Sequence, residues 1–171
     1  MRSWMFAGAL LLAMGFAASS AVAETHVLRR AGIWEAFGGS TTSGRPVCGV
    51  SSQVQDKYFG WKYFYGDDTF TIQLGKSSWQ IDDGAKQKVM MQFDQNSPWN
   101  ATATGMHFND GDAGLEFTIN RSQLDEFEQE FRSSNQAMVR FPGSDAQDWF
   151  VPLQGVNSVF DAFRQCILKM Q

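Results

Sequence analysis

His26 and His107 are the two side chains of this 171-residue sequence whose unperturbed pKa suits general base catalysis near neutral pH. A hydrolytic triad needs such a base beside a nucleophile and an orienting carboxylate. No serine here lies in the Gly-x-Ser-x-Gly turn that exposes the nucleophile of many hydrolases. We expect His26 to lie in a frayed mature N-terminus and His107 on the surface of a strand, so neither is interpreted as catalytic.

Three short polar clusters could place carboxylates together: Asp67-Asp68, Asp82-Asp83 and Asn109-Asp110-Gly111-Asp112. Glycosidases use two carboxylates at a fixed separation, which keeps a carboxylate-dependent hydrolase open as an alternative. The third cluster resembles a calcium loop, but its twelfth position is Asn120, where an EF-hand has a bidentate glutamate. Each cluster joins two strand-like runs, so we interpret all three as turns. Zinc spacings, phosphate-binding loops and dinucleotide fingerprints are not found, and we expect no metal and no cofactor.

Aromatic residues at alternate positions give the sequence its most distinctive candidate surface. Trp61, Tyr63 and Tyr65 fall on one face of a predicted strand. Such a face can stack on sugar rings or anchor a protein interface. Aromatic strands are also common in protein cores. Both interpretations stay open, with the three residues as the candidate binding site.

The two cysteines, Cys48 and Cys166, are expected to form a disulfide, since two thiols in an oxidising compartment most simply pair with each other. The close Cys-x-x-Cys spacing of redox sites is absent. The bridge would close a loop of about 118 residues, which the chain-entropy model values at on the order of 5 kcal/mol.

Residues 1–23 have the pattern of a cleaved secretory signal peptide. Arg2 precedes an uncharged apolar stretch, and Ala21-Val22-Ala23 ends it with the small residues that signal peptidase accepts. Removing Arg2 takes the net charge from −4 to −5. We therefore expect residues 24–171 to form a single β-rich domain in the periplasm. These residues contain no further apolar run long enough to span a membrane. A mildly acidic chain without a lysine or arginine block also argues against nucleic-acid binding.

Period-two alternation of apolar and polar residues predicts antiparallel strands through the middle of the chain. The predicted strands cover residues 33–37, 61–65, 70–74, 89–93, 101–108, 115–119, 137–141 and 149–153. Residues 24–46 are otherwise read as a loop or ragged hairpin because they are rich in glycine, serine and threonine.

Two segments follow the helical period instead. Residues 121–134 carry Leu124, Phe127 and Phe131 on one stripe, with Asn120 as a capping residue and an acidic face expected to be solvated. From Val156 onward a longer apolar stripe predicts a C-terminal helix, with Ser158 near its start. The expected fold is mainly β, as a β-sandwich or a strongly curved antiparallel sheet, with one short helix and a C-terminal amphipathic helix.

The order of several short motifs resembles the invasion-associated locus B family of small exported proteobacterial proteins. The motifs are Gly32-Ile33-Trp34-Glu35-Ala36, Pro46-Val47-Cys48, Ile81-Asp82-Asp83-Gly84, the run 89–94 and the run 151–159. The family's further cysteine pair is not present here. The resemblance implies a β-rich periplasmic or surface-associated protein linked with envelope function or host interaction, and it supplies no catalytic residues.

These observations favour a non-enzymatic periplasmic binding or envelope-accessory protein, with an envelope protein, a host protein or a glycan as its partner. An inhibitor of an envelope-degrading enzyme such as lysozyme is the first alternative, since an exposed acidic loop would suit a basic target. The carboxylate-dependent hydrolase is the second.

Overall fold

The computed structural model describes residues 23–170, which form ten strands and two α-helices. The predicted signal peptide lies outside this range except for Ala23. The strands are β1 (Glu24–Ala31), β2 (Trp34–Ser40), β3 (Pro46–Val54), β4 (Lys57–Phe64), β5 (Thr69–Lys76), β6 (Lys86–Phe93), β7 (Trp99–His107), β8 (Ala113–Asn120), β9 (Gln136–Arg140) and β10 (Trp149–Pro152). The helices are α1 (Leu124–Ser133) and α2 (Val156–Lys169).

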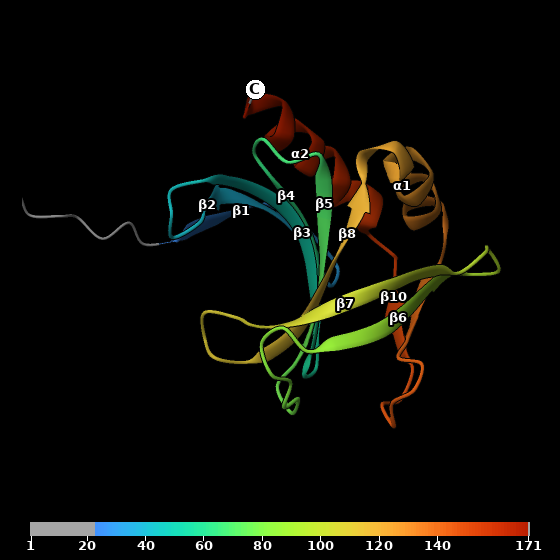
Figure 1. Ribbon diagram of the computed structural model, residues 1–171. Coiled ribbons are helices and arrows are strands. Elements are labelled where there is room, and N and C mark those ends of the chain that lie inside the picture. The colour runs from blue at the N-terminus through green and yellow to red at the C-terminus, as the bar shows by residue number, and fades with distance from the viewer. Residues whose placement is uncertain (1–22, 171) are drawn as a thin grey trace, which may run out of the picture.

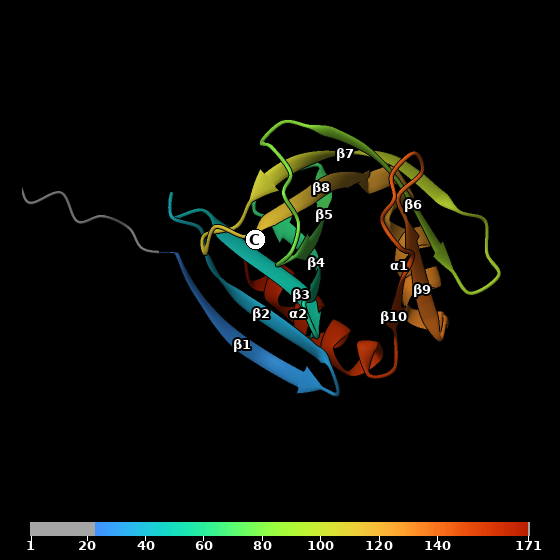
Figure 2. The same cartoon turned by 90° about the horizontal axis from the view of Figure 1, so that it is seen from below.

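All ten strands belong to one antiparallel sheet, in the order β1-β2-β3-β4-β5-β8-β7-β6-β9-β10. The sheet bends strongly and stays open, and the helices lie toward its inner side (Figures 1 and 2). Side chains alternate between the two faces of a strand, and the strands from β2 to β10 each contribute apolar side chains to the core on the inner side. The predicted fold class is confirmed, with the curved sheet rather than two separate sheets.

Of the loop and the hairpin expected as alternatives for residues 24–46, the structure contains the hairpin, formed by β1 and β2. Seven residue pairs hold β1 against β2, with an irregularity between Val27 and Arg29. His26 lies in β1, exposed and paired with Gly38, so it does not belong to a frayed terminus. β1 is exposed along nearly its whole length. An edge strand exposed on both faces shows no period-two pattern, which is why the sequence did not reveal it.

Both helical segments begin where their apolar stripes were predicted to begin, but Asn120 and Ser158 do not have the roles expected of them there. A 3-10 turn, Arg121–Gln123, precedes α1, and Asn120 makes no side-chain capping bond. α2 begins at Val156, two residues before Ser158, and Gly155 precedes it with a φ of 95°. A Cβ on Gly155 would lie 2.6 Å from the Ala31 carbonyl oxygen, so this tight entry requires glycine.

The inner side of the sheet is filled with aromatic rings from both helices. Phe127 and Phe131 of α1 and Phe160 and Phe163 of α2 are almost completely buried there. α2 packs over β1, β2 and β3. The indole N–H of Trp34, on β2, donates to the Pro152 carbonyl at 2.9 Å, which ties β2 to the far edge strand β10.

Asp94, which follows β6, anchors the start of β9. Its carboxylate accepts backbone N–H bonds from Asn135 at 2.8 Å and Gln136 at 3.1 Å, and these bonds, that from Asn135 foremost, lower the pKa of Asp94. A carboxyl group with a depressed folded-state pKa stabilises the protein above its unfolded pKa of about 4, and this contribution is lost as pH falls through the folded-state pKa.

We expect Asp94→Asn to melt at a lower temperature than the parent protein at pH 7 and the difference to shrink toward about pH 2. Thermal unfolding at both pH values measures this, and an equal difference at the two would contradict it.

Within residues 23–170, neither helix is long and apolar enough to cross a membrane.

Candidate functional site

The three predicted aromatic residues have different environments. Trp61 is fully buried, with the rings of five phenylalanines at 4.9–6.1 Å from its own: Phe70, Phe127, Phe131, Phe160 and Phe163. Tyr63 is half-buried, and Tyr65 lies beyond the end of β4 with 48% of its surface exposed. Trp61 is therefore a core residue, and the three do not form one exposed platform. Of the three, Tyr63 lies at a cavity.

This cavity lies between α1, α2 and the adjoining ends of β4 and β5, and its volume is about 250 Å³. Tyr63 and Phe70 come from the strands, and their ring centroids lie 5.0 Å apart. The cavity's apolar residues are Tyr63, Phe70, Leu124, Phe163, Ile167 and Leu168, and its charged residues are Arg121, Asp125, Glu128 and Arg164. We call it the inter-helix pocket. Its walls are apolar and its charges are balanced, which suits an uncharged apolar group bordered by polar ones.

Glu128 joins the two helices at the side of the inter-helix pocket. It is only 7% exposed, and its carboxylate lies 3.1 Å from Arg132 on α1 and 2.7 Å from Arg164 on α2. Arg132 also donates to Asn157 on α2 at 2.9 Å. A buried carboxylate with two guanidinium partners is compensated for its lost hydration and fixes the separation of the helices.

The acidic face of α1 was expected to be solvated, and for Glu128 this is wrong. Glu128 is buried between the two arginines, and Glu130 accepts a bond from the Trp99 indole N–H at 2.7 Å. One usable signal was present in the sequence, the i, i+4 spacing of Glu128 and Arg132. Arg164 follows Glu128 by 36 positions, and only the packing of α2 against α1 brings it beside Glu128.

From the inter-helix pocket, a groove lined by polar and charged residues continues between the helices. Its volume is about 580 Å³, and it shares Asp125, Glu128 and Arg164 with the pocket. Gln129, Arg132, Ser133 and Asn157 complete its lining. An apolar group in the pocket could therefore extend into hydrogen-bonding surroundings.

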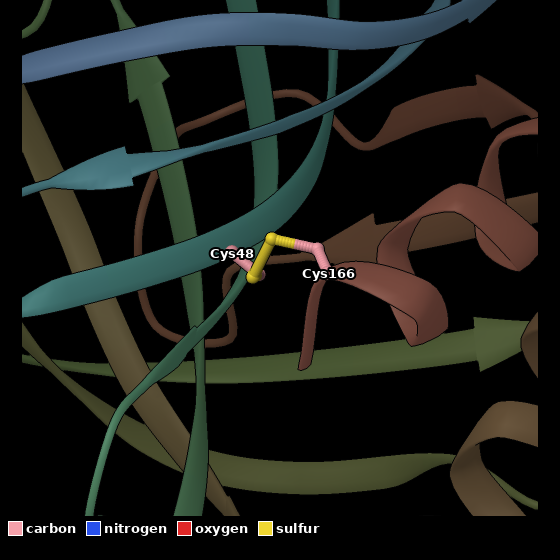
Figure 3. The surroundings of a disulfide bond; sticks show 2 residues. All are labelled: Cys48 and Cys166. Carbon is pink, nitrogen blue, oxygen red and sulfur yellow. A yellow bond between two sulfur atoms is a disulfide. The ribbon is translucent and has the colours of Figure 1, made fainter. Parts of the chain in front are cut away.

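The predicted disulfide is present and holds one wall of the inter-helix pocket. Cys48 of β3 is bonded to Cys166 of α2, with their Cα atoms 6.0 Å apart (Figure 3). Cys166 directly precedes Ile167 and Leu168, which line the pocket. The bond therefore fixes the last turns of α2 against the sheet.

The turn aspartates do not line this pocket and fall into two groups. Asp67 and Asp68 are in the turn between β4 and β5, where Asp67 pairs with Arg45 and the Asp68 carbonyl accepts the backbone N–H of Arg121. Asp82 and Asp112 line a shallow depression with His107, at the other end of β5. His107 Nδ1 lies 2.8 Å from Asp83 Oδ1. A carboxylate therefore orients the imidazole, but no serine hydroxyl among the described residues is hydrogen-bonded to His107 to complete a triad. Within residues 23–170, His, Cys, Asp and Glu side chains form no group of three or more able to hold a metal ion.

Comparison with known proteins places the fold. The crystal structure of invasion associated protein B from Bartonella henselae superposes on this chain with a TM-score of 0.55 at 15% sequence identity. The match covers 86% of this chain and 98% of that one. The fold is shared. The resemblance drawn from short motifs is thus confirmed at the level of the fold.

At the level of sequence, no protein-family model matches the chain, and no curated protein is significantly similar to it.

Proposed function

We propose that this protein is an exported, non-enzymatic envelope protein that binds a partner through the inter-helix pocket. The observation that carries the proposal is the apolar pocket of about 250 Å³ with a charged border. A closed apolar cavity of about 150 Å³ holds benzene, so one aromatic or branched side chain is of suitable size here. The pocket's apolar lining favours a protein partner over a glycan.

Three further observations support the proposed compartment, the envelope role and binding at the pocket. The disulfide fits an oxidising compartment, as does the predicted signal peptide. The structural relative is named as invasion associated, which supports an envelope-accessory role without naming a partner. The fixed helix separation makes the pocket largely pre-formed, which lowers the entropic cost of binding.

Leu168→Asp tests the pocket directly. Leu168 is 59% exposed in the pocket wall, so the substitution should fold while placing a charge where an apolar group must bind. We expect the recovery of a specific cross-linked partner from envelope extract to fall at least about tenfold, as measured by quantitative mass spectrometry.

The matched control is Phe150→Asp, because Phe150 on β10 is 60% exposed and does not line the pocket. Partner recovery should be unchanged in this variant. Equal recovery by the parent and both variants would refute the pocket as the binding site. Binding of envelope oligosaccharides alone, unaffected by Leu168→Asp, would assign the function to a glycan and to another surface.

A further inference from the structure

At the opposite end of β4 and β5 from the inter-helix pocket, two aromatic rings pack on the outer face of the sheet. Tyr58 comes from the start of β4 and Phe108 from the turn after β7, and their ring centroids are 5.3 Å apart in an edge-to-face arrangement. The Phe108 ring rests on glycines: a Cβ at Gly75 would lie 2.6 Å from it and one at Gly114 2.5 Å. Gly60 gives Tyr58 the same close approach.

These rings form the floor of a hollow of about 500 Å³, which we call the aromatic hollow. Its polar border comes from three separate segments: the β3–β4 turn with Asp56, the end of β5 with Lys76, and the β7–β8 turn with Asp110 and Asp112. Figure 1 shows these connections at the end of the sheet away from the helices. The hollow is thus independent of the inter-helix pocket in position and in its residues.

The charge of the aromatic hollow is unbalanced. Lys76 is the one cation in its lining and lies 3.8 Å from Asp56. Asp110 accepts the backbone N–H of Asp112 at 3.1 Å, and no cationic side chain of the described residues pairs with either carboxylate. Asp82 and Asp83 lie in the neighbouring loop, where His107 contacts Asp83. The carboxylates of the β7–β8 turn therefore give one side of the aromatic hollow an uncompensated negative charge.

A ring face beside free carboxylates is the arrangement that binds organic cations, because the ring quadrupole and the carboxylates attract the same charge. The protein already uses this interaction nearby, since Lys62 Nζ lies 5.7 Å from the Tyr58 ring centroid. That contact occupies Tyr58 and leaves Phe108 as the ring for an external cation. A planar guanidinium can stack on a ring and donate two parallel hydrogen bonds to a carboxylate, a planar bidentate geometry that an ammonium group does not have.

We propose that the aromatic hollow binds an arginine side chain of a basic protein partner, stacked on Phe108 and paired with Asp110 and Asp112. This site goes beyond the proposed function, because it uses another end of the sheet and selects a cation rather than an apolar group. The charge complementarity of the hollow favours a basic protein over a neutral glycan.

The test is titration calorimetry of the disulfide-bonded protein with tetra-arginine amide at low salt. The double variant Asp110→Asn/Asp112→Asn keeps the shape of the turn and should weaken binding about tenfold. Phe108→Leu should weaken it about threefold through loss of the ring. Tetra-lysine should bind more weakly than tetra-arginine, and added salt should weaken both.

The matched control is Asp68→Asn/Asp145→Asn, which changes the net charge equally at two exposed positions outside the hollow. This control should bind tetra-arginine nearly as the parent does. Leu168→Asp should also bind it normally, because that substitution is expected to impair only the inter-helix pocket. Equal weakening of binding in the control would show that the effect comes from net charge alone, and this would refute the aromatic hollow as the binding site. Binding of a neutral oligosaccharide in place of tetra-arginine would refute the preference for a cationic ligand. Failure of the parent protein to bind tetra-arginine would refute the proposal as a whole.

Discussion

Replacing Cys48 and Cys166 together with alanine is expected to lower the free energy of unfolding by about 2–5 kcal/mol. The bond spans a sequence separation of 118 residues, so its loss returns a large conformational freedom to the unfolded chain. Alanine is preferred to serine because Cys48 is fully buried, where a hydroxyl without a partner would add a cost of its own.

Urea denaturation under non-reducing conditions measures this change. The parent protein with its disulfide reduced should unfold near the midpoint of the double variant, since both lack the same constraint. Hydrogen exchange should also become faster in the last turns of α2, which carry Ile167 and Leu168. An unchanged midpoint and unchanged exchange would show that packing alone holds α2 in place.

Replacing Trp61 with alanine is expected to cost about 3–5 kcal/mol, because the ring is completely buried and the surrounding phenylalanines cannot fill the space. Trp61→Phe should cost much less. The Trp61 indole N–H is buried without a hydrogen-bond acceptor among the described residues, so phenylalanine sacrifices no hydrogen bond.

Tyr65→Ala supplies the comparison within the same predicted aromatic set. Tyr65 is 48% exposed, and its replacement should change the free energy of unfolding by less than about 0.5 kcal/mol. Chemical denaturation of the three variants measures all of these differences. A large loss for Tyr65→Ala, or a small one for Trp61→Ala, would contradict the division between core and surface described here.

The sequence predicted the elements well where one face of a strand or helix is buried. β6 and β8 alternate between buried and less buried residues over most of their length, and the apolar stripe of α2 runs from Val156 through Phe163. β1 gave no such signal, since both of its faces are exposed. The disulfide followed from cysteine number and compartment alone.

The candidate sites were harder to predict, because each combines elements that are distant in sequence. Tyr63 was a candidate from its position on a strand, but Leu124 and Leu168 join it only through the packing of both helices. The solvation of Glu128 could not be judged from α1 alone, since Arg164 covers it from α2. Phe108 likewise forms the floor of the aromatic hollow because it packs against Gly75 and Gly114, which come from two other strands.

The contact between Phe108 and its two glycines also constrains how this protein can evolve. An alanine at Gly75 or Gly114 cannot be accommodated while the ring stays in place, because the new methyl group would overlap it. Loss of the ring removes that restriction at Gly75, whereas a Cβ at Gly114 would still lie 2.9 Å from the Leu74 carbonyl oxygen. Among related sequences, an aromatic residue at position 108 and glycine at position 75 should therefore be inherited and lost together, while glycine at position 114 should persist.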